Sequence, residues 1–218
     1  MSHRLRPRPA TRRVGWLGRG RRHVALGLAT ILVAALSGCG GPAFDPTGPC
    51  TTDGSAPGAY PDLEAAVPTA LRGTPPNALD SGRACTPAGL GTLRGHGVDE
   101  LRFAGATWEM GSDSGVSLAV FTDPNGPALD SAWVSEFYES GARAGKKVES
   151  VTAADYAVTD QIGGRRIDVL NGESYQTIVA WELNGRVAVA LVANSIRRVE
   201  TKEAHEQDVR AAVDAFGS

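Results

Sequence analysis

The sequence contains few of the residues that build metal centres. Its 218 residues include four histidines and three cysteines, and two of the histidines lie within the first 38 residues. The other two, His96 and His205, are far apart in the chain, and neither is accompanied by histidine, cysteine and aspartate at metal-ligand spacing. The sequence therefore predicts no metal site, and no motif in it predicts another cofactor.

Motifs for nucleophilic catalysis are also lacking. The segment Gly111-Ser112-Asp113-Ser114-Gly115 has an aspartate where a Gly-x-Ser-x-Gly elbow has its serine. Asp113-Ser114-Gly115 resembles the nucleophile segment of chymotrypsin-like proteases, but His96, 18 residues upstream, is too close to belong to an earlier barrel. A hairpin loop accounts for the same residues. Acid–base catalysis by paired carboxylates stays open, because Asp168 and Glu182 lie on neighbouring predicted strands.

The start of the chain has no apolar run of about 20 residues, the length that a membrane-spanning helix needs. The run from Val24 to Leu36 has only 13 residues, and it follows eight arginines without a single acidic residue. A basic start, a short apolar stretch and small residues at its end are typical of an export signal. The sequence therefore predicts a signal peptide over residues 1–38.

The predicted signal ends in Leu36-Ser37-Gly38-Cys39. Small residues followed by a cysteine at this place resemble the lipobox of bacterial lipoproteins. The resemblance implies cleavage before Cys39 and two or three acyl chains on that cysteine, which would form a stable anchor. The mature protein is then expected at the cell membrane, lipid-anchored and facing the extracytoplasmic side. Arginine pairs at 12–13 and 21–22 leave both general secretion and twin-arginine export open.

Loss of the signal peptide changes the charge of the protein. The whole chain has 22 basic and 24 acidic residues, and removal of eight arginines leaves 14 basic residues against 24 acidic ones. The remaining 180 residues therefore carry a net charge of about −10. A domain of this charge repels phosphate backbones and anionic lipid head groups, so the sequence predicts no nucleic-acid partner.

The three cysteines divide into one lipid site and one pair. Once Cys39 is assigned to lipid, Cys50 and Cys85 are left in a domain that is expected outside the cytoplasm, where disulfides persist. We expect these two to form a bridge, the alternative being two independent buried thiols. A disulfide that closes a loop of this size adds about 3–4 kcal/mol of stability in the loop-entropy estimate.

The mature chain is expected to form a flexible tether over residues 39–49, rich in glycine and proline, and a single domain over residues 50–218. The stretch from Cys50 to Cys85 is poor in patterns of regular structure. Short helices are expected at 61–67 and 86–93, longer helices at 130–144 and 201–216, and strands at 101–110, 116–121, 151–158, around 167–169, 175–183 and 186–193.

The clearest local pattern is a hairpin around Asn184-Gly185, a dipeptide typical of the two-residue type I′ turn. This turn predicts that Trp181 lies opposite Ala188 and that Val179 lies opposite Ala190. Both faces of the hairpin are then apolar, which indicates a central position covered on both sides. The last helix is expected to cover one of these faces.

These elements predict an α+β domain with a mainly antiparallel sheet of about five to six strands and helices packed on its faces. The expected order is (short α)-β-β-α-β-β-β-α. This element order is similar to the Mog1/PsbP-like architecture of some exported lipoproteins, and the resemblance is one of architecture without a shared motif.

The sequence favours a non-enzymatic role: a membrane-anchored exported lipoprotein that acts as a binding or interaction module. Its expected partners are the membrane, through the lipid on Cys39, and an envelope protein, cell-wall component or small ligand. Two alternatives stay open, an accessory subunit of an envelope complex and an envelope hydrolase. Fold analogy does not decide among them, because function depends on sites.

Overall fold

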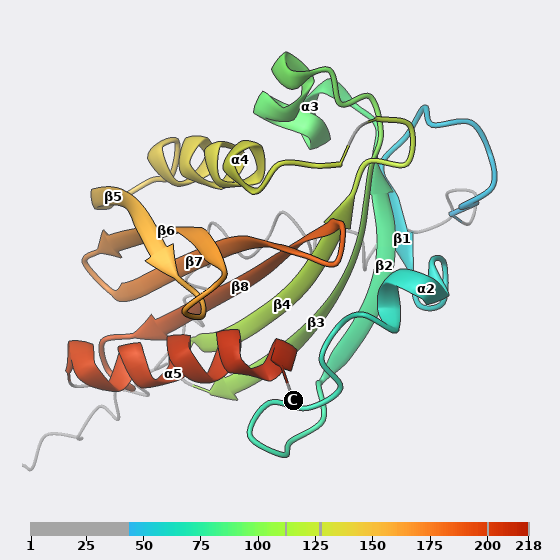
Figure 1. The fold of residues 1–218 in the computed structure, drawn as a ribbon. Helices are drawn as coiled ribbons and strands as arrows, with labels where there is room; N and C mark the ends of the chain where they lie inside the picture. The colour runs from blue at the N-terminus through green and yellow to red at the C-terminus, as the bar shows by residue number, and fades with distance from the viewer. Residues whose placement is uncertain (1–43, 112, 127, 200, 218) are drawn as a thin grey trace, which may run out of the picture.

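The computed structural model of the protein describes residues 44–111, 113–126, 128–199 and 201–217. The predicted signal peptide and Cys39 lie outside these residues. Eight strands form one antiparallel sheet in the order β1-β2-β3-β4-β8-β7-β6-β5 (Figure 1). The strands are β1 (Gly54–Ala56), β2 (Ala78–Ala84), β3 (Leu101–Gly111), β4 (Ser114–Thr122), β5 (Val148–Ala157), β6 (Gly163–Asn171), β7 (Ser174–Leu183) and β8 (Arg186–Ser195).

Helices cover both faces of the sheet, with α4 on one face and α5 on the other (Figure 1). The α-helices are α2 (Pro61–Glu64), α3 (Pro87–Leu90), α4 (Ser131–Arg143) and α5 (Lys202–Asp214), and two 3-10 helices are η1 (Gly91–His96) and η2 (Ala215–Gly217). The predicted antiparallel sheet with helices on its faces is confirmed. The longer helices begin where expected, because Asp130 and Thr201 cap α4 and α5 by accepting a hydrogen bond from a first-turn backbone N–H.

The predicted number of strands, five to six, is wrong, and so is the predicted element order. Strands β1 and β2 lie between Cys50 and Cys85, where the sequence pattern indicated little regular structure. The expected order placed only short helices there and had three strands after the first long helix, whereas all four of the strand segments expected after that helix form strands. The sequence of β2, Ala-Leu-Asp-Ser-Gly-Arg-Ala, has no hydrophobic alternation. It forms a strand because all seven of its residues pair with β3, from Ala78 opposite Thr107 onward.

The β7–β8 hairpin matches its prediction. Trp181 pairs with Ala188 and Val179 with Ala190, and both Asn184 and Gly185 have the positive φ that a type I′ turn needs, 53° and 75°. Because β7 and β8 lie in the middle of the sheet, both of their faces are buried, as the sequence predicted.

Two hydrophobic cores sit on the two faces of the sheet. The first core packs Val209 and Val213 of α5 against Trp181 and its neighbours. The second core packs Val134 and Tyr138 of α4 against the opposite face. Trp181 is 1 % exposed, and Phe216 contacts its ring edge-on at a centroid distance of 5.1 Å. Trp181 is therefore part of the first core.

Candidate functional site

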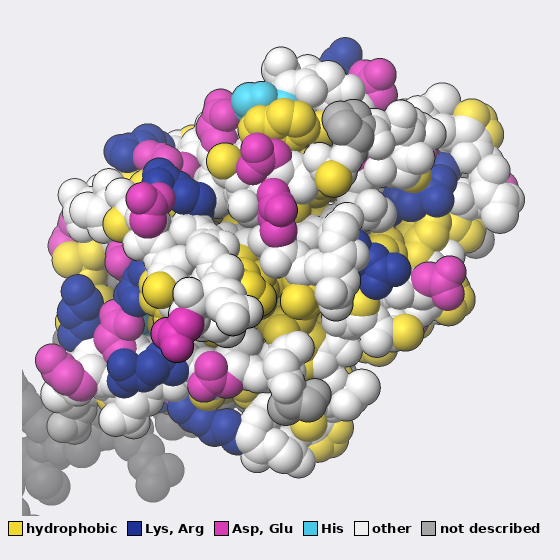
Figure 2. Space-filling model, in the orientation of Figure 1, with side chains coloured by type: hydrophobic (Ala, Val, Ile, Leu, Met, Phe, Trp, Pro, Cys, Tyr) yellow, Lys and Arg dark blue, Asp and Glu magenta, His cyan; other side chains and the backbone are white. Residues whose placement is uncertain are grey.

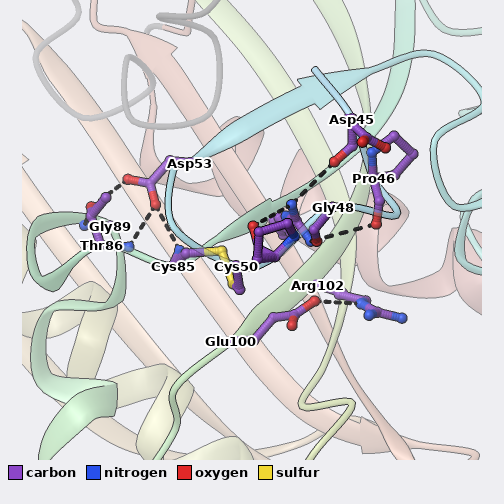
Figure 3. The surroundings of a disulfide bond; sticks show 12 residues. Asp45, Pro46, Gly48, Cys50, Asp53, Cys85, Thr86, Gly89, Glu100 and Arg102 are labelled. Atoms are coloured by element: carbon purple, nitrogen blue, oxygen red, sulfur yellow. Dashed lines mark hydrogen bonds and ion pairs between the residues drawn. A yellow bond between two sulfur atoms is a disulfide. The ribbon is translucent and has the colours of Figure 1, made fainter. Parts of the chain in front are cut away.

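The cysteine pair lies at one end of β2 (Figure 3). The Cα atoms of Cys50 and Cys85 are 5.4 Å apart with their sulfurs bonded, which fits the expected disulfide. Beside it, the carboxylate of Asp53 accepts hydrogen bonds from the backbone N–H groups of Cys85 at 2.6 Å and Thr86 at 2.8 Å. Burial raises the pKa of Asp53, but these donors outweigh burial and hold the pKa below its ordinary value.

A polar cluster lies between α5 and strands β6, β7 and β8, on the face of the sheet that α5 covers. Hydrogen bonds join its side chains into one continuous network. We call this group the α5 polar cluster; its members are Arg72, Arg166, Asp168, Thr177, Asn194, Arg198, His205, Glu206 and Asp208.

His205, 2 % exposed, is the centre of the α5 polar cluster. Its Nε2 lies 2.9 Å from the hydroxyl of Thr177, which in turn lies 2.6 Å from Oδ1 of Asp168. Because an ionised carboxylate only accepts, Thr177 donates its single proton to Asp168, and Nε2 of His205 donates to Thr177. On the other side of the ring, Nδ1 accepts from the side-chain amide of Asn194 at 3.0 Å. His205 is therefore a neutral imidazole with its proton on Nε2.

The network continues from Asn194 to Asp208. The amide nitrogen of Asn194 also donates to Oδ2 of Asp208 at 3.0 Å, and its carbonyl oxygen accepts from Arg198 at 2.6 Å. Asp208 accepts further bonds from Arg198 at 2.8 Å and Arg72 at 2.7 Å. Burial raises the pKa of Asp208, but the three donors outweigh it and the pKa lies below its ordinary value. Charged partners on both sides thus fix the orientation of the Asn194 amide.

Arg166 of β6 forms the other end of the cluster. Its guanidinium donates to Asp168 and to Glu206 of α5, each at 2.8 Å. The bonds from Arg166 hold the pKa of Glu206 below its ordinary value. For Asp168, burial raises the pKa, but the bonds from Arg166 and Thr177 outweigh it, so the pKa is again lowered. Charge-assisted bonds at both ends of the cluster therefore fasten α5 to the sheet.

The row Thr177–His205–Asn194 has the residue types of a nucleophile, a base and an orienting group, but its hydrogen bonds do not suit catalysis. The Thr177 hydroxyl donates to Asp168 instead of to the imidazole, so the imidazole does not act as its base. Thr177 is also only 1 % exposed, which leaves a substrate no access to its oxygen. The arrangement positions α5.

The structure separates the two carboxylates that the sequence placed on neighbouring strands. Asp168 of β6 pairs with Thr177, and Glu182 lies five positions further along β7. An odd number of positions along a strand reverses the side of the sheet, so Asp168 and Glu182 lie on opposite faces. They do not form an acid–base pair.

The two other residues that the sequence singled out are in different places. Ser114, at the start of β4, accepts a hydrogen bond from the backbone N–H of Ser195 and is buried. His96, at the end of η1, stacks on Trp133 of α4 at a centroid distance of 4.8 Å, and its Nε2 lies 2.8 Å from a carboxylate oxygen of Glu136. Neither residue meets a catalytic partner in these contacts.

A hollow of about 300 Å³ lies between α4 and strands β5 and β6. Its α4 wall carries Glu136 and Glu139, and its sheet wall carries Arg165, with Ile167 and small residues between them. The walls thus have opposite charge over an apolar floor, an arrangement suited to a small ligand or to a protruding peptide side chain. Figure 2 shows further hydrophobic side chains at the centre of the face between α4 and α5.

Within the described ranges, no group of three or more histidine, cysteine, aspartate or glutamate residues is placed to hold a metal ion. In the same ranges, no helix combines the length and the apolar character needed to cross a membrane. Comparison of the chain with protein-family models, with curated proteins and with solved structures finds no match. The function of the protein is therefore inferred from the geometry of its own residues.

Sequence reasoning recognised Asp168 and His205 but missed that they belong to one cluster. Two patterns were available: polar residues alternate with buried ones along β6, and His205 and Asp208 are three residues apart on α5, hence on one helix face. Thr177 and Asn194 had no pattern of their own, because each lies next to another polar residue near one end of its strand, Gln176 in β7 and Ser195 in β8.

Proposed function

We propose that the chain is an exported lipoprotein, anchored to the cell membrane through lipid on Cys39, whose domain is a non-enzymatic binding module on the extracytoplasmic side. Its partner is an envelope protein, a cell-wall component or a small ligand. Accessory function in an envelope complex is a special case of the same role. The hollow between α4 and β5–β6 is where we expect a ligand to bind.

The observation that carries this proposal is the pairing of Cys50 with Cys85. Disulfides persist outside the cytoplasm, so the pair supports export. The chain has three cysteines, and this pairing leaves Cys39 as the third. The disulfide between Cys50 and Cys85 supports export of the domain, and the separate sequence that ends in Cys39 supports the lipid site.

The α5 polar cluster favours binding over hydrolysis. Its histidine and hydroxyl are buried and committed to internal hydrogen bonds, and the sequence-predicted carboxylate pair lies on opposite faces of the sheet. The charged residues of the hollow are partly exposed to solvent, and they form salt bridges with neighbouring side chains; these pairs are Glu136–His96, Glu139–Arg143 and Arg165–Asp155.

Metabolic labelling with a fatty acid tests the lipoprotein proposal. Wild-type protein should take up the label and sediment with membranes, whereas Cys39→Ala should do neither. The matched control is the double variant Cys50→Ser with Cys85→Ser, which should keep the label because it leaves Cys39 unchanged. Label that persists in Cys39→Ala overturns the proposal.

Native mass spectrometry of the purified protein tests the binding role. A retained small-molecule adduct that Arg165→Glu abolishes supports the hollow as its site. The matched control is Arg186→Glu, which reverses a charge at the start of β8, away from the hollow. An adduct equally retained by both variants places the ligand elsewhere.

A further inference from the structure

Arg83 of β2 is a buried arginine, 4 % exposed, whose partners are backbone carbonyls. Its Nη1 donates to the backbone oxygen of Gly48 at 2.8 Å, and its Nη2 donates to those of Asp45 and Pro49, both at 3.1 Å. None of the ion pairs found among the described residues includes Arg83. The buried guanidinium of Arg83 thus donates its hydrogen bonds to the segment that precedes β1.

The same segment is held at both of its ends. The ring of Phe44 packs so closely on Gly54 of β1 that a Cβ atom there would overlap it, and the Arg83 guanidinium lies 5.7 Å from the ring centroid. At the other end, Cys50 is bonded to Cys85. We call residues 44–49 the strap.

The strap lies within the segment 39–49 that the sequence predicts to be a flexible tether. Phe44 is the one large apolar side chain of the strap, and a single apolar residue forms no periodic pattern from which docking could be predicted. What Arg83 binds is the carbonyl oxygen, which every residue carries. The sequence therefore contains no pattern for this contact.

We propose that Arg83 makes the strap a rigid spacer that holds the β1–β2 edge of the domain toward the membrane. The proposal rests on lipidation of Cys39, as proposed above. Four residues separate Cys39 from Phe44. The five Cα–Cα steps span at most about 18 Å, so the docked edge stays close to the lipid surface.

The opposite edge of the sheet then points into the extracytoplasmic space. Strand β5 is seven strand spacings from β1, a distance of roughly 33 Å across the sheet. The hollow between α4 and β5–β6 is therefore presented away from the membrane, where an envelope partner can reach it. Docking of the strap leaves four residues between Cys39 and the docked chain, instead of the ten that precede Cys50, and this shorter link keeps the β1–β2 edge near the membrane.

The first test is proteolysis of the full chain, purified from producing cells in detergent. Thermolysin cuts before large apolar residues, and Phe44 is protected while the strap is docked. Arg83→Met should increase the rate of cleavage before Phe44 roughly tenfold, because the open form becomes more populated. The matched control is Arg102→Met. Arg102 of β3 lies opposite Arg83 in the sheet, and loss of its charge should leave cleavage before Phe44 at the wild-type rate.

A second variant covers the case in which Arg83→Met disturbs the whole fold. Gly54→Ala places a methyl group against the Phe44 ring while leaving β2 and its arginine intact. It should also expose the site before Phe44, with an unchanged far-ultraviolet circular dichroism spectrum. If both variants are cleaved as slowly as the wild-type protein, the proposal that Arg83 and Phe44 hold the strap in place is wrong.

The orientation is measured in vesicles with acceptor-labelled head groups. A donor dye is placed on Ala65→Cys, beside α2, or on Ala157→Cys, at the end of β5; both positions are exposed. Energy transfer should be stronger from position 65 than from position 157, and Arg83→Met should abolish the difference. Equal transfer in wild type overturns the orientation even if the strap is docked. Protein that does not associate with vesicles refutes the lipid anchor, while the proteolysis result stands independently.

Discussion

At the scale of single residues, the direction of each hydrogen bond limits what His205 can do. Protonation would place a second N–H of the ring against the amide N–H of Asn194. Asn194 cannot turn over to accept it, because its oxygen is bonded to Arg198 and its nitrogen to Asp208. The cluster thus holds only the neutral form of the histidine without rearrangement.

This restriction predicts a pH dependence of stability. Burial lowers the pKa of His205 below its ordinary value, so the unfolded chain takes up this proton before the folded one. Neutral His205 makes its full contribution to the free energy of unfolding above about pH 6.5, the pKa of an unfolded histidine. This contribution is lost as the pH falls from there through the lower pKa of His205 in the folded state. Asp168, Asp208 and Glu206 also have lowered pKa values, so they stabilise the folded state in their ionised form. Their contribution to stability is lost only below about pH 4, where carboxylates of the unfolded chain become protonated.

Melting temperatures between pH 7.5 and pH 5 measure this effect. The wild-type melting temperature should fall across this range, and His205→Gln should remove most of the slope. His96→Gln, which changes a histidine on the opposite face of the sheet, is the control and should keep the slope. Identical slopes for wild type and His205→Gln would show that the cluster accommodates the proton.

A glycine in β2 gives a second prediction at the residue scale. A Cβ on Gly82 would overlap the backbone oxygen of Gly54 and the ring of Phe103. Gly82→Ala should therefore destabilise the protein by about 1–3 kcal/mol in urea unfolding. Gly95→Ala is the matched control, because nothing lies within 4 Å of its Cβ position. Equal stabilities of the two variants would mean that β1 and β2 are not packed as described.

At the scale of elements, the sequence predicted those that carry their own pattern. The β7–β8 hairpin, α4 and α5 combine turn or cap residues with hydrophobic periodicity, and they were predicted within a few residues. β1 and β2 lack such patterns; β2 depends on pairing with β3, and β1 depends on pairing with β2. The same division applies to the α5 polar cluster, because its members come from several elements and only packing brings them together.

The disulfide acts at this scale, because it ties the segment before β1 to the end of β2. The double variant Cys50→Ser with Cys85→Ser should lose about 3–4 kcal/mol of unfolding free energy. Chemical denaturation measures the loss, and reduced wild-type protein provides the control and should match the variant. A variant as stable as oxidised wild type would mean that the bridge contributes nothing.

At the scale of the whole molecule, the two edges of the sheet differ. β1 is a three-residue strand that lies beside the strap, whereas β5 runs for ten residues with most of its side chains exposed. The helices cover the two faces between these edges. A lipid near β1 and a binding surface near β5 would use opposite ends of one rigid sheet, and the acidic domain would be held at the membrane by lipid instead of by charge.

Lipid on Cys39, which we propose as the anchor of an exported domain, is detectable by mass spectrometry of the N-terminal peptide from membrane-extracted protein. We expect a chain that begins at Cys39 and carries two or three acyl chains on that residue. A chain that keeps residues 1–38, or one that begins elsewhere with Cys39 unmodified or absent, would refute the lipid anchor.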